Sequence, residues 1–519
     1  MLDPRDQPAV CAATTRTTIS DCVAGGMTED APAGANQRDD ADDSTTDTLA
    51  TVIDDRLADY REALFEVLSQ PSISTTGEGM DAAADLVVDT LSDQGLDARR
   101  IATDRHPLVY AECGPVDADE SAGDDLPTVL FYGHYDVQPP GDESEWDSPA
   151  FEPTVRDGAV YARGAGDNKG QFLAHAFAVD ALLAADAFPN VSVKLLIEGG
   201  EESGSAGLRE YLRGEYGERG APTEIADADL VYVADGPQHA VVAERDGEQV
   251  REGTPTLIYG NRGVLSAELE CRTANTDLHS GNFGGPVPAA TNELVAALDS
   301  VRGEDGDEIV VDGFHDGTNV TDADRELVAA IPDDSAAIAE ELELSGFASE
   351  DPYYERLLTR PTLTINGLSG GYQGEGMKTV LPATASAKID CRLVPDQDPD
   401  AVFEALRDHF AAVTPDVELT KRTTFPPMKT PVDTPLAEPV AGALEAVWGT
   451  EPVELPVLGG SLPAAHFREV PSLADVPVLV VPYANHDQGN HSPNEHLDLR
   501  CFENGIRTSA RVIRALASQ

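Results

Sequence analysis

Hydrophobic residues follow two patterns in the first half of the chain. Mainly apolar runs at 128–132, 192–198 and 230–234 are typical of strands that are buried on both faces. Between these runs, apolar residues recur at helical spacing, at about 168–185 and near 208–212. Because strands alternate with helices, the pattern predicts an α/β domain around a mainly parallel sheet.

The middle of the chain shows a different pattern. Residues 265–272 and 385–393 alternate strictly between apolar and polar side chains, which predicts strands with one buried and one solvated face. Two helices, near 287–302 and 400–413, and two further strands, at 361–366 and near 416–424, are predicted around them. The resulting order, β-α-β-β-α-β, indicates a ferredoxin-like α+β domain.

The first pattern returns at the end of the chain, with a buried strand at 477–484 and a helix at about 499–516. We therefore expect the ferredoxin-like domain to be inserted into the α/β domain. Near the start of the chain, apolar residues recur at helical spacing only after Asp54. We therefore expect the residues before Asp54 to form a disordered tail. The predicted segments are an acidic tail at 1–50, the first part of the α/β domain at 51–258, the inserted domain at 259–428 and the second part of the α/β domain at 429–519. Acidic, alanine-rich residues 303–360 indicate extra helices on the inserted domain, without an assigned role.

The chain carries 35 Lys and Arg residues against 94 Asp and Glu residues, a formal net charge of −59. Nucleic acid is itself polyanionic, so this charge disfavours it as a partner. Self-repulsion of this size is screened in concentrated salt, where the Debye length falls to about 3 Å at 1 M. The charge therefore favours a halophilic protein of a salt-rich cytoplasm, and a merely acidic protein is the alternative.

Cysteine usage and hydropathy bear on the compartment. Six cysteines are scattered without CxxC spacing, which predicts reduced thiols in a cytosol and no disulfide framework or zinc knuckle. The sequence has no run of 18 apolar residues, and its start lacks a basic region followed by an apolar core. We therefore expect no membrane span, no signal peptide and a cytoplasmic location.

Aspartate, glutamate and histidine residues follow the ends of the predicted strands. In an open α/β sheet, ligands bind beyond the carboxyl ends of the strands. His134 and Asp136 follow the first buried strand, Glu201 and Glu202 the second, Asp235 the third and His491 the last, while Asp167 precedes the helix at 168–185. This combination of donors is the one that divalent metal ions bind.

His134 and Asp136 are two residues apart at a strand end, so their side chains point the same way. A metal-bound imidazole usually donates its other N–H to a carboxylate, which fixes the ring. Asp136 is therefore predicted to hold His134, either through its carboxylate or through the backbone. A polar pair without a ligand is the alternative, and the other donors at neighbouring strand ends disfavour it.

The charges of these side chains suit two metal ions. Three carboxylates and one bridging hydroxide balance two divalent cations, as in hydrolases whose metals lie about 3.5–4 Å apart. Adjacent Glu201 and Glu202 cannot both face one ion from a regular strand. One of them is therefore predicted to bind metal and the other to serve as the general base.

Five ordered motifs resemble a known family: GHYDV (133–137), GAGDNKG (164–170), EGGEESGS (198–205), VADG (233–236) and GNHSPNEH (489–496). Over about residues 55–519 the chain is similar to the dinuclear zinc or manganese metallopeptidases. This family includes carnosine dipeptidases, carboxypeptidase G, aminoacylase and succinyl-diaminopimelate desuccinylase. The resemblance implies that one ion is held by His134, Asp167 and Asp235, and the other by Asp167, Glu202 and His491. It further implies that Glu201 is the base, that Asp136 is the partner of His134, and that the cofactor is two zinc or manganese ions per subunit.

The segments GHYDVQPP (133–140) and TDLHSGNFGG (276–285) look most like the dipeptidase, carnosinase-like branch. The branch implies a homodimer whose inserted domain acts as a lid. His279 of one subunit would help to stabilise the oxyanion in the active site of the other. Thr379, Arg392 and Ser461 match its substrate-contacting positions, with Arg392 on a terminal carboxylate. From pattern alone, a solvated Arg392, a loop Ser461 and a hydrogen-bonded loop His279 remain alternatives.

The function indicated is a dinuclear metal-dependent hydrolase that cleaves an amide bond next to a free carboxylate, most simply in dipeptides or short peptides. Within the same family, the alternative substrate is an N-acyl amino acid or succinyl-diaminopimelate. An inactive homologue that serves as a binding or assembly module is disfavoured, because every inferred ligand and the base are present.

Overall fold

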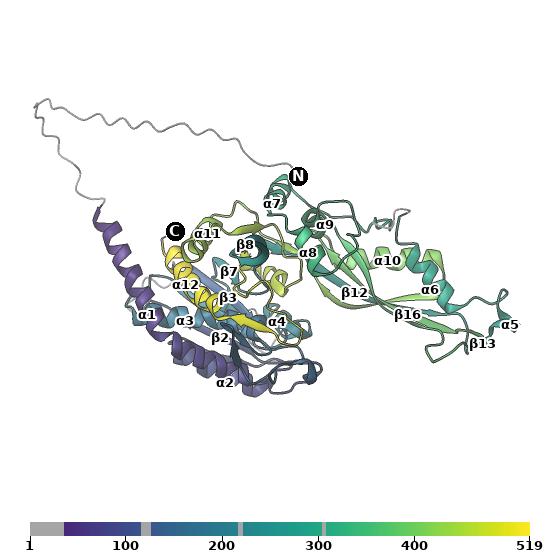
Figure 1. Ribbon diagram of the computed structural model, residues 1–519, viewed down its shortest axis with the longest axis horizontal. Helices are drawn as coiled ribbons and strands as arrows, with labels where there is room; N and C mark the ends of the chain where they lie inside the picture. Colours follow the sequence, from purple (N-terminus) through teal and green to yellow (C-terminus); the bar gives the residue numbers. More distant parts are fainter. Residues whose placement is uncertain (1–35, 116–125, 216–221, 246, 304–307, 519) are drawn as a thin grey trace, which may run out of the picture. The chain divides into compact units, whose positions relative to one another are not determined.

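The computed structural model describes residues 36–115, 126–215, 222–245, 247–303 and 308–518 (Figure 1). Most of the predicted tail, residues 1–35, lies outside them. Helix α1 (Asn36–Ser69) starts earlier than its expected apolar pattern, so residues 36–50 are helical. Leu49 and Ile53 continue the helical spacing upstream and are only 4% and 2% exposed, which explains the longer helix.

The larger sheet has eight strands, and its centre is parallel. β3 pairs in parallel with β6 on one side and with β7 on the other, and β7 pairs in parallel with β20. The strand order across the sheet is β1 (Asp97–Ile101), β2 (Leu108–Cys113), β6 (Ser192–Glu198), β3 (Thr128–His134), β7 (Leu230–Val233), β20 (Val478–Val480), β10 (Thr256–Ile258) and β19 (Val453–Leu455). The predicted α/β fold with a mainly parallel sheet is confirmed, although only part of the run at 477–484 forms a strand.

Alternate side chains of β3 enter two separate hydrophobic cores. Val129 and Phe131 belong to one core, and Leu130 and Tyr132 belong to the other. This division follows from the two-residue period of a strand and explains why β3 is apolar throughout. The first core contains residues of α1, α2 (Met80–Asp93), α3 (Gly170–Ala184), α11 (Ala437–Trp448) and α12 (Leu499–Leu516), and the second contains residues of α4 (Ala206–Leu212) and the segment Pro463–Leu473.

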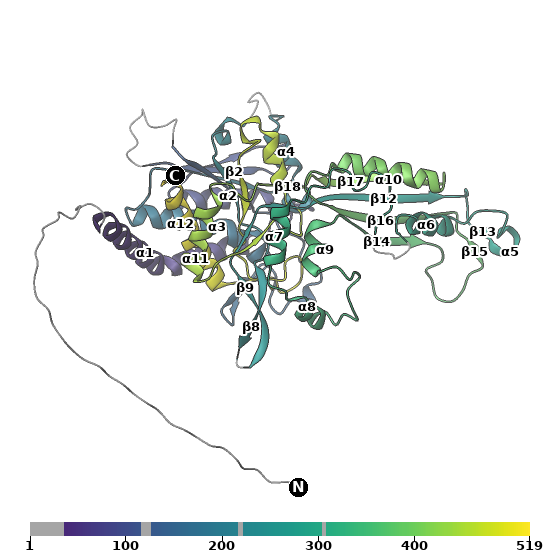
Figure 2. The same cartoon turned by 90° about the horizontal axis from the view of Figure 1, so that it is seen from above.

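The smaller sheet has four antiparallel strands (Figure 2). Its order is β14 (Thr362–Gly370), β16 (Thr384–Leu393), β12 (Gly263–Arg272) and β17 (Val417–Phe425), with helices α6 (Ala290–Asp299) and α10 (Pro399–Val413) packed against it. Leu269 and Cys271 of β12 are buried against the helices, while Glu270 between them is exposed. The predicted ferredoxin-like β-α-β-β-α-β order is therefore confirmed.

The segment 303–360 contains the extra helices that its composition predicts, α7 (Asp322–Ala330), α8 (Ser335–Glu341) and α9 (Tyr353–Thr359). The expectation that they belong to the inserted domain is wrong in part. Val328, Ile331 and Leu358 pack into the second core of the larger sheet, and Lys429 forms an ion pair with Asp324 of α7 at 2.5 Å. α7 and α9 therefore lie against the larger domain, because their buried apolar side chains face it.

The remaining elements are short. They are β4 (Thr154–Arg156), β5 (Ala159–Tyr161), β8 (His239–Arg245), β9 (Glu248–Thr254), β11 (Gly260–Asn261), β13 (Leu278–His279), β15 (Val380–Leu381), β18 (Met428–Lys429), β21 (His496–Asp498) and α5 (Ser280–Phe283). Within the part of the chain that the structure describes, no helix combines the length and the apolar character needed to cross a bilayer.

Candidate metal centre

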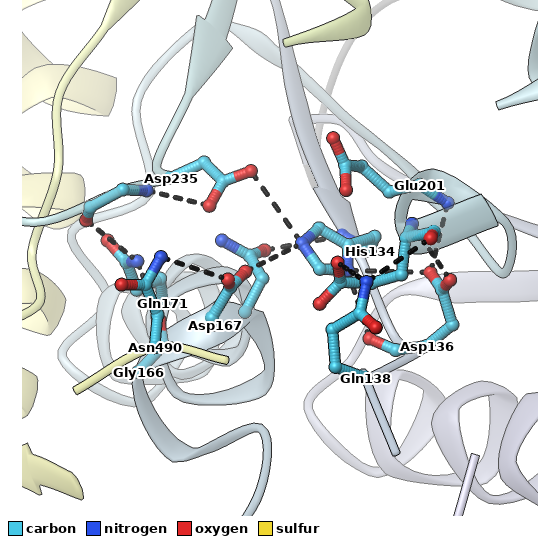
Figure 3. Close-up of polar contacts among 12 residues, drawn as sticks. His134, Asp136, Gln138, Gly166, Asp167, Gln171, Glu201, Asp235 and Asn490 are labelled. Atoms are coloured by element: carbon cyan, nitrogen blue, oxygen red, sulfur yellow. Dashed lines mark hydrogen bonds and ion pairs between the residues drawn. The ribbon is translucent and has the colours of Figure 1, made fainter. Parts of the chain in front are cut away.

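Five of the predicted side chains meet beyond the carboxyl ends of the larger sheet. Figure 3 shows three of them, His134, Asp167 and Asp235. His134 ends β3, Asp235 lies two residues after β7, and Asp167 lies in the turn before α3. Glu202 follows β6, and His491 lies in the loop between β20 and β21. The parallel strands bring these distant segments to one edge of the sheet, as the strand-end rule predicts.

The donor atoms form two groups that share one residue. One group is His134, Asp167 and Asp235, and the other is Asp167, Glu202 and His491; within each, the donor atoms lie within 4.8 Å of one another. Nε2 of His134 lies 3.1 Å from Oδ1 of Asp167, and Nε2 of His491 lies 3.1 Å from Oδ2 of Asp167. The two oxygens of Asp167 thus face different groups, which is the arrangement of a bridging carboxylate.

The two groups differ in their access to solvent. His134, Asp167 and Asp235 are all buried, whereas the side chain of His491 is 53% exposed. Nε2 of His491 also lies 3.2 Å from Oε2 of Glu202. A substrate can therefore reach the second group more directly than the first.

The electrostatics of the site suit cations. Burial raises the pKa of Asp235 to about 7, and the negative charges of Asp167 and Glu202 add to this effect. Although burial opposes it, hydrogen bonds from His134 and His491 hold the pKa of Asp167 below its ordinary value. Among the described residues, the ion pairs of Asp167, Glu202 and Asp235 are all with these two histidines. Even two protonated imidazoles would offset only two of the three carboxylates, whereas a pair of divalent ions, which neutral imidazoles can bind, offsets all three.

Asp136 contacts both His134 and the glutamate pair. Nδ1 of His134 lies 3.0 Å from the backbone oxygen of Asp136 and 3.4 Å from its Oδ1. The two carboxylate oxygens accept hydrogen bonds, each of 3.1 Å, from the backbone N–H groups of Glu201 and Glu202. Asp136 thus orients His134 chiefly through the backbone, one of the two expected routes, and its carboxylate fixes the turn that carries both glutamates.

Glu201 is the carboxylate of the pair that lies outside both donor groups. Figure 3 shows it beside His134, with its backbone nitrogen joined to Asp136. Burial raises the pKa of Glu201 well above its ordinary value, and the charges of Asp235 and Glu202 raise it further. A general base works best when its pKa approaches the working pH, so this environment suits the predicted role.

Sequence reasoning missed two supports of the donor groups. Nε2 of Gln138 donates to Oε2 of Glu202 at 2.9 Å. Oε1 of Glu495 accepts from the backbone N–H groups of Gly166 and Asp167 at 3.1 and 3.0 Å, and its Oε2 forms a buried ion pair with Arg163 at 2.7 Å. Both residues belong to motifs that carry ligands, GHYDVQPP and GNHSPNEH, and that position is the only signal the sequence offers.

Two of the predicted substrate residues are in contact with each other. Nη1 of Arg392, on β16, donates to Oγ of Ser461 at 3.0 Å. Nε of Arg392 donates to Asp390 at 3.2 Å, so the guanidinium is held in place from two sides. Arg392 is therefore not a freely solvated side chain, and the contact joins the smaller sheet to the loop before Pro463.

The other two, His279 and Thr379, lie together at a second place. β13 pairs with β15 through His279 and Val380, and the backbone of Ser280 donates to the carbonyl of Thr379 at 3.2 Å. Both residues are exposed, and Nδ1 of His279 accepts from the backbone of Gly281 at 3.0 Å. Among the contacts of the described residues, none joins His279 or Thr379 to the donor groups.

A model of the peptidase family M20/M25/M40 matches residues 130–515 of the chain. The chain belongs to this family. It is 27% identical to β-Ala-His dipeptidase from Mus musculus over 475 residues, which cover 88% of this chain and 89% of that relative. It is 29% identical to a Cys-Gly metallodipeptidase from Schizosaccharomyces pombe over 494 residues, which cover 91% of this chain and 98% of the relative.

Solved structures of M20 proteins have the same fold. The crystal structure of an M20 family metallo-carboxypeptidase from Sulfolobus solfataricus aligns with a TM-score of 0.77 at 31% identity, covering 89% of this chain and 99% of that chain. The crystal structure of human carnosine dipeptidase 1 aligns with a TM-score of 0.72 at 26% identity, covering 91% of this chain and 100% of that chain. The predicted family and its dipeptidase branch are confirmed, as is the assignment of the chain to the metallopeptidases.

The metal-binding character of this M20 peptidase rests on its own donor groups. The match to the family model spans all five of the donors, from His134 to His491. The two groups share one carboxylate, as a dinuclear centre requires. The identity of the metal is not fixed by the donors, because imidazole and carboxylate ligands serve both zinc and manganese.

Proposed function

We propose that this M20 peptidase hydrolyses the amide bond of dipeptides or short peptides that have a free carboxylate. The observation that carries the proposal is the pair of donor groups sharing Asp167, with Glu201 beside them. The names of the relatives agree with it, since β-Ala-His and Cys-Gly are dipeptides and a carboxypeptidase acts at a free carboxyl end.

In the proposed mechanism, His134, Asp167 and Asp235 would hold one zinc or manganese ion, and Asp167, Glu202 and His491 would hold the other. When bound, such ions supply an acidified water and polarise the scissile carbonyl. Glu201 accepts the proton of the attacking water and returns it to the leaving amine. Burial raises the pKa of Glu201 above its ordinary value, which makes the carboxylate a stronger base toward the attacking water.

Substrate orientation is assigned to Arg392 and Ser461. A guanidinium fork matches the plane of a carboxylate, and the contacts with Ser461 and Asp390 hold Arg392 in one orientation. The pair would bind the terminal carboxylate of a dipeptide and so place the preceding amide bond at the donor groups. Thr379 would contact the substrate from the partner subunit's lid.

A substrate panel tests the proposal. With zinc or manganese added, we expect a free dipeptide to be hydrolysed with kcat/KM about 10- to 100-fold higher than the same dipeptide with a C-terminal amide, because one charge-assisted contact is lost. Rates are measured by release of the free amino acid. Faster hydrolysis of N-acyl amino acids or succinyl-diaminopimelate would replace the dipeptidase assignment with a deacylase. No hydrolysis of any of them would favour the inactive homologue.

We also propose that the chain forms a homodimer through the inserted domain, residues 259–428. β14 is an edge strand of the smaller sheet, and its Leu368 is 66% exposed. Phe283, Tyr372 and Met377 of the same domain are exposed as well. Exposed apolar side chains next to an open sheet edge suit burial against a second copy of the chain. In such a dimer, His279 would act in the site of the other subunit and stabilise the developing oxyanion.

The action of His279 across the dimer can be tested with mixed dimers. The variants His279→Ala and Glu201→Gln are each expected to be inactive as homodimers. A mixed dimer, isolated with two different affinity tags, should recover about half of the wild-type activity, since one of its two sites is intact. A mixed dimer of Glu201→Gln with Asp235→Asn is the control. It should stay inactive, because each change inactivates the site of its own subunit. If the mixed dimer of His279→Ala with Glu201→Gln recovers no activity, the assigned role of His279 is contradicted.

We further propose that the protein works in a salt-rich cytoplasm. The net charge of −59 supports this, because lowering the salt from 1 M to 0.01 M lengthens the Debye length from about 3 to about 30 Å. We expect the melting temperature, followed by circular dichroism, to fall steeply when KCl is reduced over this range. KCl should restore it, while sucrose, which is uncharged, should restore much less. Full stability and activity in dilute buffer would contradict the proposal.

A further inference from the structure

Two buried amide side chains lie directly after the shared ligand Asp167. Asn168 and Gln171 are both fully buried. Nδ2 of Asn168 donates to the carbonyl of Ala234 at 2.7 Å, and its Oδ1 accepts from the backbone N–H of His134 at 3.2 Å. One side chain thus joins the backbone of one ligand, His134, to the residue before another, Asp235.

Gln171 makes four hydrogen bonds to the backbone. Its Nε2 donates to the carbonyls of Gly166 and Gly236, at 2.7 and 3.1 Å. Its Oε1 accepts from the N–H groups of Tyr483 and Ala484, at 2.7 and 3.2 Å. A glutamine amide has two donor hydrogens and two acceptor sites, so every one of them is used. A saturated buried group of this kind has a single low-energy orientation.

The contacts of both amides converge on one of the two donor groups. The carbonyls on either side of Asp235, those of Ala234 and Gly236, are each held by one of the amides. The same two side chains hold the N–H of His134 and the carbonyl of Gly166, the residue before Asp167. All three members of the buried donor group are therefore tied to one short segment of chain.

The other donor group has different supports. Glu202 is held by Gln138 through its carboxylate and by Asp136 through its backbone N–H. Among the hydrogen bonds of the described residues, none joins Asn168 or Gln171 to Glu202 or His491. Apart from Asp167, which both groups share, the amides thus hold the backbone at or beside ligands of the buried group alone.

We propose that Asn168 and Gln171 are positioning residues for the ion of His134, Asp167 and Asp235, and that they fix the spacing of these ligands before metal binds. The inference rests on the proposed two-ion function. Asp167 and Asp235 must both be ionised to bind a cation, and two negative charges this close repel each other. The amides hold the backbone on both sides of Asp235 and oppose this separation. Hydrogen-bond partners of metal ligands commonly contribute 10- to 100-fold to affinity.

The test isolates each ion in turn. Zn²⁺ affinity is measured by competition with a chromogenic chelator in two backgrounds of the full chain. His491→Ala leaves the buried group, and Asp235→Asn leaves the other group. Gln171→Met, which is neutral and of similar size, is introduced into both. Gln397→Met is the matched control, because Gln397 is equally buried and also binds backbone groups, of Phe314 and Val394, in the inserted domain.

Gln171→Met is expected to weaken Zn²⁺ binding about 10- to 100-fold in the His491→Ala background. In the Asp235→Asn background, Gln171→Met should change the Zn²⁺ affinity by less than about threefold. Gln397→Met should leave the Zn²⁺ affinity unchanged in both backgrounds. Asn168→Ala should give the same selective loss, and it decides the outcome if Gln171→Met does not fold. Equal weakening in both backgrounds, or none in either, would overturn the positioning role. Failure of the unsubstituted chain to bind two ions would instead overturn the proposed function.

Discussion

Replacement of Glu201 by glutamine is expected to lower kcat by at least about 10²–10⁴-fold while two metal ions stay bound. The amide has nearly the shape of the carboxylate, but it cannot accept the proton of the attacking water. Glu201 lies outside both donor groups, so its loss removes no ligand. The fixed turn should survive, because Asp136 binds the backbone N–H of Glu201 and not its side chain. Steady-state hydrolysis of a dipeptide and metal analysis of the purified variant measure the two effects.

Glu202→Gln supplies the matched comparison, since it changes the neighbouring residue in the same way. Glu202 belongs to the second donor group and lies 3.2 Å from His491. This variant should lose activity together with one ion, whereas Glu201→Gln should lose activity alone. Retained turnover in Glu201→Gln would remove the residue from its assigned role, and loss of an ion would identify it as a ligand.

The fold and the donor residues were predictable because both follow from short-range rules. Apolar runs such as 128–132 must be buried on both faces, and alternation at 265–272 must expose one face. Once the parallel strands are placed, the residues after them, such as His134 and Asp235, must gather at one edge. The ends of helices were less predictable. α1 extends upstream of Asp54, where Leu49 and Ile53 are buried, and tertiary packing of this kind is not visible in a local pattern.

The supports of the site were not predictable from sequence. Asn168 and Gln171 contact backbone groups of distant segments, and Gln138 contacts the carboxylate of Glu202, and such contacts leave no periodic pattern. Glu201 and Glu202 could be separated into base and ligand only by resemblance, because spacing alone leaves both options open. Helices α7 and α9 were placed on the wrong domain for a similar reason. The apolar side chains of these helices predict that one face of each helix is buried. Which of the two domains covers that face is visible only in the tertiary structure.

Asp167→Asn is expected to remove both metal ions and to abolish hydrolysis. Asp167 is the only residue common to the two donor groups, and its two oxygens lie 3.1 Å from Nε2 of His134 and Nε2 of His491. Asparagine offers a single, uncharged acceptor oxygen, so neither group keeps its anionic bridge. We expect Zn²⁺ affinity at both sites to fall by more than about 100-fold, since loss of a ligand exceeds loss of a ligand's hydrogen-bond partner.

Thermal unfolding provides a readout of this loss that does not depend on turnover. Metal that binds only the folded chain stabilises it by about 4 kcal/mol per site when its free concentration is 1,000-fold above Kd. The wild type should therefore melt at a higher temperature with Zn²⁺ than with a chelator, and Asp167→Asn should melt at nearly the same temperature in both. Asp235→Asn should keep part of the difference, because only one group contains Asp235. An Asp167→Asn variant that keeps the full stabilisation would show that the two ions do not share this carboxylate, and the dinuclear mechanism would lose its basis.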